Sequence, residues 1–374
     1  MTLVFVVNSG SSSLKYQLVD LDTGESVVGG LIERIGEKGS DAPNHEAAMT
    51  SALDHLGHGH DIAAVGHRVV HGGTVFTAAT VITDQVERQI DELAVLAPLH
   101  NPANLIGIRA ARKSLPDVPQ VAVFDTAFHR TLPPEAYTYA IDAELARKHG
   151  VRRYGFHGTS FKYVSEAAAQ LLDRPLESLK MIVLHLGNGA SACAIDGGIS
   201  IDTSMGMTPL EGLVMGTRSG DIDPSVLGHL HRQAGLGFEE LDRLLNRESG
   251  LLGLAGSGDM RDVQEAADRG DEKSGAALAV YLHRIRTYVG AYIAQLGGVD
   301  AIVFTAGVGE HSAVVRERSL AGLSTLGISV DSTRNKADAS GARFISPEQS
   351  PVAVLVVPTN EELEIARQSV AAIG

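Results

Sequence analysis

The chain has 374 residues, more than one ordinary domain, so we expect two domains. Lysine and arginine number 31 and aspartate and glutamate 45, and the resulting net charge of −14 disfavours broad binding to nucleic acid or to anionic membrane. The chain contains 44% apolar residues, a single cysteine (Cys193), and no signal or membrane-spanning pattern at its start. We therefore expect a soluble cytoplasmic protein.

Two similar strand–turn–strand units open the two halves of the chain. The first has apolar, β-rich runs at residues 3–7 and 14–21, and the second has them at residues 181–186 and 192–196. The shared pattern indicates an internal duplication. Chance similarity of short segments is the alternative.

The most loop-like segment is 36–60, which is rich in Gly, His and Asp. Its histidines His55, His58 and His60 resemble a metal cluster. No Cys or carboxylate completes a usual ligand spacing around them, so we favour an exposed polar loop over a metal site.

Capping residues predict three helix starts. Asp84 with Glu87, and Thr359 with Glu362, have the spacing of a capping box, and Ser160 is a candidate cap for a helix between them. Apolar strands are predicted at residues 121–124, 301–305 and 352–357. Because strands alternate with helices, the sequence predicts an α/β fold, in which ligands bind at strand ends.

The common phosphate-binding and hydrolase motifs do not occur in the sequence. There is no P-loop motif, and Ser312 stands where a dinucleotide fingerprint beginning at Gly307 requires its third glycine. Neither G-x-S-x-G nor H-E-x-x-H is found. The commonest hydrolase and metalloprotease classes are therefore disfavoured.

Three turns remain as candidates for phosphate contact. The turn 8–13, with Lys15 beyond it, offers backbone N–H groups, hydroxyls and a cation. Glycines in the turns 187–189 and 307–310 allow close approach of the backbone to a ligand. Each turn alone also fits an ordinary tight turn, but three in one acidic chain favour a nucleotide.

Two arginines, Arg68 and Arg218, lie in apolar segments bounded by glycines. A guanidinium in such a place either pairs with a buried carboxylate or binds an anionic ligand, and the spacing does not decide between these. Asp125 and His157 are likewise either satisfied core residues or catalytic groups.

Over nearly its whole length the chain resembles the acetate and propionate kinase family. The stretches that carry the resemblance are VNSGSSSLK (7–15), GHRVVHGG (66–73), APLHNP (97–102), VFDTAFH (123–129), RYGFHGTS (153–160), HLGNG (185–189) and TNEE (359–362). The resemblance implies an actin-like ATPase fold of duplicated ribonuclease H-like domains with nucleotide in the cleft between them. The expected domains are residues 1–129 with 364–374, and residues 130–363.

The resemblance also implies a reaction, in which ATP phosphorylates acetate reversibly to give ADP and acetyl phosphate. Mg²⁺ is the implied metal, with Mn²⁺ as a substitute. Propionate or another short-chain carboxylate is the alternative substrate, and a non-catalytic nucleotide switch on the same fold is a less favoured alternative. The family further implies a homodimer and metabolic coupling to a phosphate acetyltransferase, with no nucleic-acid or membrane partner.

The resemblance assigns roles to individual residues. Arg68 would hold acetate or the phosphoryl group, and Arg218 and His157 would neutralise charge during transfer. Asp125 is the acidic residue of the family's active site. Because acetate is already ionised at neutral pH, we expect Asp125 to orient an arginine rather than to act as acid or base. The residues matching the pocket for the acetate methyl group, for which core packing is the alternative, are Val70, Leu99, Phe156 and Pro209.

Metal and nucleotide positions are carried over in the same way. Asn8 and Glu361 match the metal positions and offer the oxygen ligands that suit Mg²⁺. Lys15 is expected near the phosphates. The residues matching the nucleotide-contacting segments are His185, Leu186, Gly187, Asn188, Gly189, Asp259, Met260, Arg261, Gly307, Val308, Gly309, Glu310 and His311. Phe161 stands where many relatives have histidine, and we assign it no role.

Overall fold

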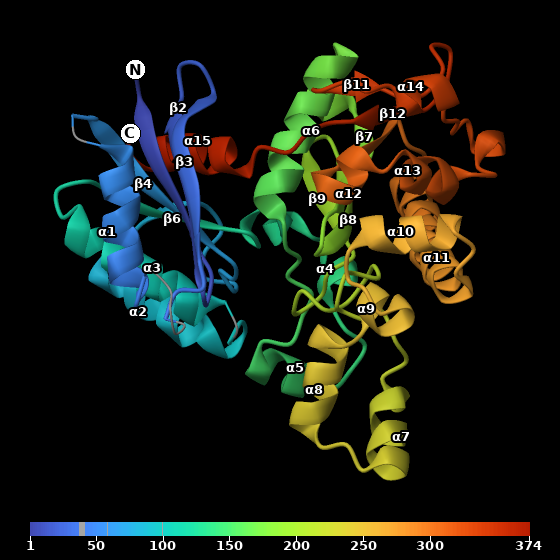
Figure 1. Ribbon diagram of the computed structural model, residues 1–374, viewed down its shortest axis with the longest axis horizontal. Coiled ribbons are helices and arrows are strands. Elements are labelled where there is room, and N and C mark those ends of the chain that lie inside the picture. The colour runs from blue at the N-terminus through green and yellow to red at the C-terminus, as the bar shows by residue number, and fades with distance from the viewer. Residues whose placement is uncertain (37–41, 58, 99) are drawn as a thin grey trace. The chain divides into compact units, whose positions relative to one another are not determined.

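The computed structural model describes residues 1–36, 42–57, 59–98 and 100–374. The chain divides into two compact units. Unit 1 consists of Met1–Arg130, Phe156–Tyr163 and Asn360–Gly374, and unit 2 consists of Thr131–Gly155 and Val164–Thr359. Each unit is built around its own sheet (Figure 1).

A six-stranded sheet with the order β3-β2-β1-β4-β6-β5 forms the centre of unit 1. Its strands are β1 (Leu3–Ser9), β2 (Ser13–Asp20), β3 (Glu25–Glu33), β4 (Ile62–Val69), β5 (Thr80–Val81) and β6 (Gln120–Phe124). β1, β4 and β6 run parallel, β2 and β3 continue the sheet antiparallel on one side, and β5 pairs antiparallel with β6 on the other.

Helices cover both faces of this sheet. α1 (His45–Leu56) and α3 (Asn101–Ser114) pack with Phe5 of β1 on one face, whereas α15 (Glu361–Ile373) packs with Val4 and Val6 on the other. Successive side chains of a strand point to opposite faces, so a strand that is apolar at every position must be covered on both sides. α2 (Asp84–Glu92), followed by η1 (Leu93–Val95), packs its buried residues Val86 and Ile90 in a third cluster with the end of β6.

Unit 2 contains a second six-stranded sheet with the order β11-β12-β10-β7-β8-β9. Its strands are β7 (Lys180–Leu186), β8 (Ala190–Asp196), β9 (Ile199–Thr203), β10 (Ala301–Thr305), β11 (Arg343–Phe344) and β12 (Ala353–Val356). Read from β9 to β11, this sheet has the same sequence of parallel and antiparallel neighbours as the sheet of unit 1 read from β3 to β5. β7, β8 and β9 correspond to β1, β2 and β3, and β10 and β12 to β4 and β6. The internal duplication and the α/β fold predicted from the sequence are confirmed.

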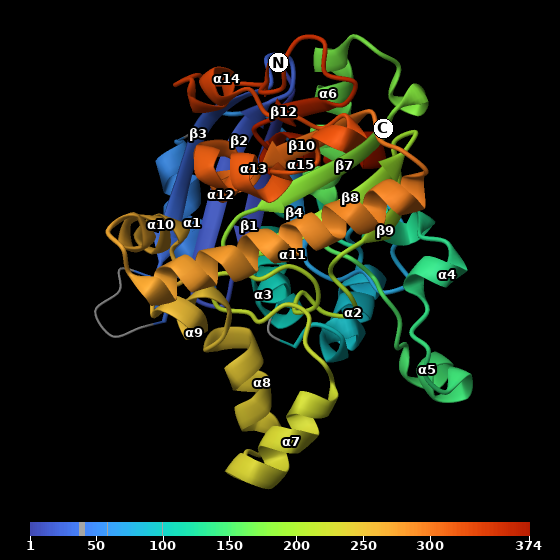
Figure 2. The same cartoon turned by 90° about the vertical axis from the view of Figure 1, so that its right-hand side faces the viewer.

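The longest helix of unit 2, α11 (Glu272–Leu296), lies across β7 and β8 (Figure 2). The other helices are α4 (Pro134–Tyr137), α5 (Ala143–His149), η3 (Leu176–Ser178), α7 (Ser225–Ala234), α8 (Phe238–Arg247), α9 (Gly250–Ala255), α10 (Met260–Asp268), α12 (Ala306–His311), α13 (Ala313–Leu320), η4 (Ser324–Leu326) and α14 (Ser332–Lys336). Two further helices, η2 (Ala127–Thr131) and α6 (Gly158–Leu172), have residues in both units. Within the described ranges, no helix combines the length and apolarity needed to cross a bilayer.

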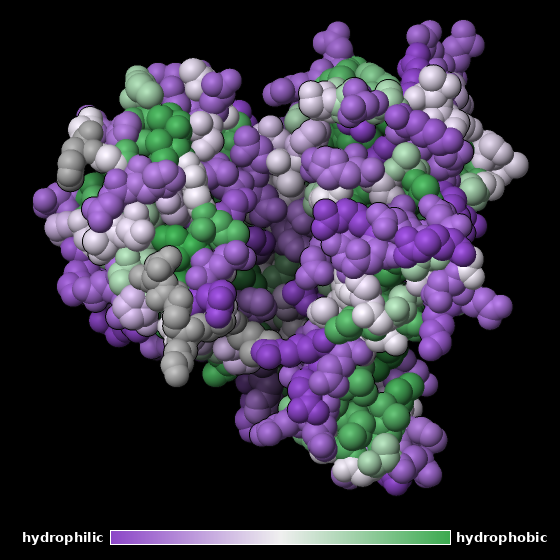
Figure 3. Space-filling view, viewed as in Figure 1, coloured by the Kyte–Doolittle hydropathy of each residue, from purple (hydrophilic) through white to green (hydrophobic). Residues whose placement is uncertain are grey.

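Apolar side chains gather on the surface of α7 and α8 (Figure 3). Phe238, the first residue of α8, is 83% exposed, and Val226 of α7 is also exposed. Phe238 therefore lies outside the core of unit 2.

The predicted helix starts are wrong by one to three residues. The cap of α2 is Thr83, whose hydroxyl accepts from Val86 N at 3.3 Å, and the cap of α15 is Asn360, whose Oδ1 accepts from Leu363 N at 3.0 Å. Ser160 lies inside α6, which begins at Gly158. Each of these stretches offers several polar side chains, and the residue that caps is the one at which the backbone leaves the extended conformation.

The prediction of a loop over 36–60 is wrong for residues 45–56, which form α1. Asn44 caps this helix by accepting from Ala47 N at 2.9 Å. His55 lies on α1, where its Nδ1 is hydrogen-bonded to Tyr16 Oη at 2.6 Å, and His60 Nε2 bonds to Leu56 O. His58 lies outside the described residues.

Candidate active site

A buried ion pair lies at the carboxyl ends of the parallel strands β4 and β6 in unit 1. Arg68 donates from Nε to both oxygens of Asp125 at 3.0 and 3.1 Å and from Nη2 to Oδ2 at 2.8 Å. Asp125 directly follows β6, and its backbone N–H donates to Val69 O at 3.0 Å. Glu361, the first residue of α15, places Oε2 3.6 Å from Arg68 Nη2. The three side chains form a charged cluster where open α/β sheets bind ligands.

Burial and charge act against each other in this cluster. Burial by itself would lower the pKa of the Arg68 guanidinium, but the Asp125 and Glu361 carboxylates outweigh it and raise that pKa above its usual value. Burial raises the pKa of the Asp125 carboxyl, and Arg68 opposes this rise. The strand ends therefore hold a permanently charged guanidinium.

The start of α6 packs closely on Asp125. Gly158 N donates to Asp125 O at 2.9 Å, and a Cβ on Gly158 would collide with that carbonyl oxygen, so the approach requires glycine. His157, the preceding residue, has φ 59°, in the left-handed region that non-glycine residues rarely adopt. Backbone strain of this kind occurs preferentially at functional sites. The site residues His157 and Asp125 are therefore linked through the backbone of Gly158.

The residues assigned to the methyl pocket lie in different places. Val70 follows β4, is partly exposed, and donates from its backbone N to Asn104 Oδ1 at 3.1 Å. The ring of Phe156 is buried in unit 1, edge-to-face with the His71 ring at 5.5 Å. Pro209 belongs to unit 2. Leu99 lies outside the described residues.

The candidate metal residues Asn8 and Glu361 both belong to unit 1. Asn8 lies on β1 opposite Lys15 on β2. Glu361 Oε2 is buried, and no described residue donates a hydrogen bond to it. An orphaned carboxylate oxygen fits a hard cation such as Mg²⁺, which takes oxygen ligands, so this donor set fits the ion. Lys15 forms an ion pair with Glu362, the residue after Glu361.

Arg218 lies in unit 2, on the loop between β9 and α7. Its Nη1 donates to Pro209 O at 2.9 Å and contacts Met215 Sδ at 3.6 Å. Burial lowers the pKa of this guanidinium, and no carboxylate in the described part of the chain opposes that effect. A largely buried cation without a counter-ion is suited to bind an anionic ligand.

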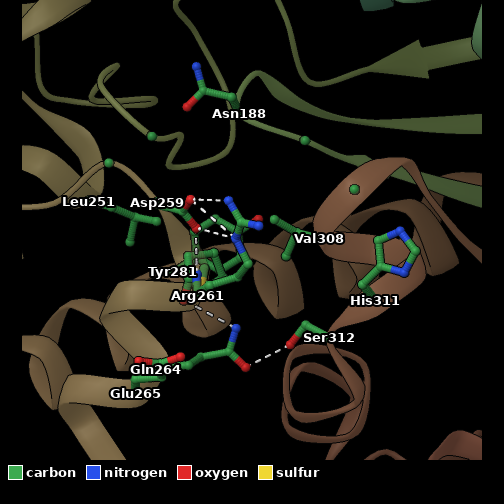
Figure 4. Close-up of a pocket in the computed structure, with 15 residues that line it drawn as sticks. Asn188, Leu251, Asp259, Arg261, Gln264, Glu265, Tyr281, Val308, His311 and Ser312 are labelled. Atoms are coloured by element: carbon green, nitrogen blue, oxygen red, sulfur yellow. Dashed lines mark hydrogen bonds and ion pairs between the residues drawn. The ribbon is translucent and has the colours of Figure 1, made fainter. Parts of the chain in front are cut away.

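One cavity of about 680 Å³ in unit 2 brings together the three segments that were expected to contact the nucleotide (Figure 4). The assigned residues that line it are Gly187, Asn188, Asp259, Met260, Arg261, Gly307, Val308 and His311. Its volume is in the range of small-molecule sites. Figure 4 shows Arg261 folded back onto Asp259, to which its guanidinium donates hydrogen bonds. These bonds lower the pKa of the Asp259 carboxyl to about 2.

The other assigned residues of these segments do not line the cavity. They are His185, Leu186, Gly189, Gly309 and Glu310. The carbonyls of Gly309 and Glu310 accept from Nη1 of the buried Arg316 at 3.0 and 2.8 Å. These hydrogen bonds fix the end of α12. Val308 and His311 of this helix line the cavity.

Several lining residues were not found from the sequence. They are Gly216, Leu251, Gly258, Gln264, Glu265, Tyr281 and Ser312. Gln264 lies one helical turn after Met260, a spacing that could have indicated it, and it accepts from Ser312 Oγ at 2.8 Å (Figure 4). Gly216 and Tyr281 come from separate segments that only the fold brings to the cavity.

The chain was compared with known proteins. The model of the Acetokinase family matches residues 3–367. The chain is 63% identical to an acetate kinase of Clavibacter michiganensis, with 100% of this chain and 99% of the relative covered. The structure resembles a crystal structure of Porphyromonas gingivalis acetate kinase, with 42% identity, full coverage of both chains and a TM-score of 0.96. It also resembles a propionate kinase from Francisella tularensis, with 41% identity, 99% and 100% coverage and a TM-score of 0.93.

Proposed function

The chain belongs to the acetokinase family, and we propose that it is an acetate kinase. In the proposed reaction an acetate oxygen attacks the terminal phosphorus of ATP, the bond from that phosphorus to the bridging oxygen breaks, and acetyl phosphate and ADP result. The observation that carries the proposal is the match of residues 3–367, nearly the whole chain, to one family of carboxylate kinases. The enzyme is accordingly a phosphotransferase with a carboxyl group as acceptor.

The cluster in unit 1 suits the binding of a carboxylate. Arg68 uses Nε and Nη2 on Asp125, so its remaining N–H groups are available to an anionic substrate. Asp125 holds the guanidinium plane in place. We propose that Arg68 binds acetate, that Asp125 orients Arg68, and that Val70, Leu99, Phe156 and Pro209 contact the methyl group.

Phosphoryl transfer requires mainly positioning and stabilisation of charge on the transferred group. Arg218 is partly buried and has no carboxylate partner among the described residues, so it supplies a cation that is not already neutralised. We propose that Arg218 and His157 stabilise the equatorial phosphoryl oxygens.

The family's nucleotide substrates, ATP and ADP, suit the cavity in unit 2. We propose that Gly187, Asn188, Asp259–Arg261 and Gly307–His311 contact the nucleotide, with Lys15 near the phosphates. Mg²⁺ (or Mn²⁺) would be held by Asn8 and Glu361 and would neutralise phosphate charge. Glu361 keeps one oxygen free of protein hydrogen bonds for this role.

Several finer statements belong to the same proposal. They are the domain boundaries 1–129 with 364–374 and 130–363, a homodimer, a cytoplasmic location and metabolic coupling to a phosphate acetyltransferase. Propionate is the second candidate substrate, favoured by the similarity to the Francisella tularensis propionate kinase. The non-catalytic switch is not favoured, because such a protein has no need of an arginine poised for a carboxylate.

A panel of carboxylates tests the proposed substrate. The purified protein is incubated with Mg·ATP and formate, acetate, propionate or butyrate, and acyl phosphate is trapped with hydroxylamine. We expect the largest kcat/KM for acetate and a smaller one for propionate, because one methylene changes apolar binding by only about 1–3 kcal/mol. A larger kcat/KM for propionate would make the protein a propionate kinase.

A further inference from the structure

We propose that Asp221 and Glu211 are positioning residues for Arg218, the arginine to which a phosphoryl-binding role is given above. They act through the segment 204–221, here called the arginine loop. The inference rests on the role proposed above for Arg218, which this loop carries. Each carboxylate is bonded to one arginine and one tyrosine. Both lie on the same loop as Pro209, whose carbonyl accepts from Arg218.

Asp221 closes the second half of the arginine loop. Its backbone N donates to Gly212 O at 3.0 Å, and its Oδ1 accepts from Gly212 N at 2.8 Å. Gly220 has φ 68°, and a Cβ there would meet Gly212 O, so the closure requires a glycine beside Asp221. The chain between Gly212 and Asp221 is therefore tied at its base, with Arg218 inside it.

The remaining oxygen of Asp221 is held by α11. Its Oδ2 accepts from Tyr288 Oη at 2.9 Å and from Arg284 Nη1 at 3.3 Å. Burial, followed by the charge of Asp221, raises the pKa of the Tyr288 phenol, so the phenol is a neutral donor at physiological pH. These bonds attach the arginine loop to α11, the longest helix of unit 2, which packs on the sheet of that unit.

Glu211 fixes the first half of the loop in the same way. It accepts from Arg153 Nη2 at 2.6 Å and from the Tyr139 hydroxyl. Nη1 of Arg153 also donates to three successive backbone carbonyls at the loop's start, those of Thr203, Ser204 and Met205, at 3.0–3.1 Å. These bonds fix the backbone that leads to Pro209, and the carbonyl of Pro209 accepts from Arg218.

The two clusters also explain why Arg218 has no carboxylate partner. Asp221 stands three residues from Arg218 and is the nearest acidic residue to it in the sequence. Its two oxygens are already occupied by a backbone N–H, a phenol and a second guanidinium. The clusters therefore position Arg218 and keep a neighbouring carboxylate from neutralising the cation that the substrate needs.

Asp221→Asn tests the inference, because asparagine keeps the shape but lacks the charge that holds Arg284. We expect kcat to fall by about 10–100-fold, the scale of a small displacement of a group that acts on the transition state. The KM for ATP should change little, because Gly216, the loop residue that lines the nucleotide cavity, has its own backbone bonds to Asn188 and Leu252. The milder Tyr288→Phe removes a single hydroxyl and should lower kcat in the same direction by less.

Asp300→Asn is the matched control. Asp300 also accepts from an arginine, Arg174 at 2.8 Å, and from a backbone N–H, that of Lys180 at 2.8 Å, and its exposure of 31% is close to the 29% of Asp221. Its hydrogen bonds to other residues in the described part of the chain do not involve the arginine loop. We expect a similar loss of thermal stability in both variants, with kcat lowered only in Asp221→Asn.

A double-mutant cycle with Arg218→Ala separates positioning from general damage. Arg218→Ala alone should lower kcat by about 10²–10³. If Asp221 acts through Arg218, adding Asp221→Asn or Tyr288→Phe to Arg218→Ala should lower kcat no further. Full additivity, or a wild-type kcat in both loop variants, would overturn the inference. If Arg218→Ala itself keeps a wild-type kcat, the proposed role of Arg218 fails instead.

Discussion

Arg68 donates three hydrogen bonds to Asp125, two from Nε and one from Nη2, all between 2.8 and 3.1 Å. Both carboxylate oxygens therefore face the guanidinium. A carboxylate engaged in this way is suited to orienting the arginine and not to moving protons, and acetate, which is ionised at neutral pH, needs no base.

Asp125→Asn distinguishes orientation from acid–base chemistry. The amide can accept fewer hydrogen bonds from Arg68 and carries no charge, so we expect the KM for acetate to rise by about tenfold or more. The pH dependence of the remaining kcat between moderately acidic and neutral pH should match wild type. If the variant instead loses an acid limb present in the wild-type profile, Asp125 acts as a base.

Glu361→Ala tests the candidate metal position. The carboxylate stands in the first turn of α15, where the helix dipole favours an anion, and its Oε2 has no protein donor. Its loss should raise the Mg²⁺ concentration that gives half-maximal activity. Glu362→Ala is the control, because Glu362 occupies the same helical turn but pairs with Lys15. Overlapping Mg²⁺ titrations of wild type and Glu361→Ala would contradict the assignment.

Val70→Ala tests the methyl pocket. Removing two methyl groups from a partly exposed wall should make room for one methylene of propionate and weaken the packing around acetate. The ratio of kcat/KM for propionate to that for acetate should rise at least several-fold and by no more than the roughly 10–200-fold that one methylene contributes. An unchanged ratio in a folded variant would place Val70 in the core and not in the pocket.

His67 predicts a pH dependence of stability. Its ring is buried, and burial lowers the pKa of His67 to about 4 from 6.5, despite the bond of Nε2 to Gln120 Oε1 at 2.8 Å. Below pH 6.5 His67 binds a proton in the unfolded chain but stays neutral in the folded chain. The free energy of unfolding therefore decreases as the pH falls toward 4. The loss should be about 2 kcal/mol at about pH 5.

His67→Gln, which cannot titrate, isolates this contribution. Urea unfolding of both proteins at neutral pH and at about pH 5 gives the two changes in unfolding free energy, and their difference is the part due to His67. Equal changes in the two proteins would show that His67 is protonated in the folded state as readily as in the unfolded one.

Much of the fold follows from local patterns in the sequence. The strand predicted at residues 301–305 coincides with β10, and the two strand–turn–strand units became β1–β2 and β7–β8, at equivalent places in the two sheets. β1, β7 and β10 are apolar at most positions, the pattern expected of strands that are buried on both faces. α1 was missed because it lies within a segment rich in Gly, His and Asp. Its helix is stabilised by packing Met49 and Leu56 against the sheet.

The candidate site was predictable where strands end and unpredictable where distant segments meet. Asp125 directly follows a recognisable strand, and its bond to Arg68 follows from the pairing of two parallel strands. The partners of the arginine loop, such as Tyr288 and Arg153, come from helices and turns far away in the chain. No local periodicity encodes those contacts, because tertiary packing alone decides which side chains reach a loop.

Direct phosphoryl transfer from ATP to acetate fixes the ratio of the two products, so their stoichiometry is the decisive measurement. ADP and hydroxylamine-trapped acyl phosphate are measured in the same reaction, with and without acetate, using purified wild-type protein and Mg²⁺. Direct transfer should give equal amounts of ADP and acetyl hydroxamate with acetate, and almost no ADP without it. ADP released in the absence of acetate, or in its presence without a matching amount of acetyl hydroxamate, would exclude direct transfer and indicate an ATP hydrolase.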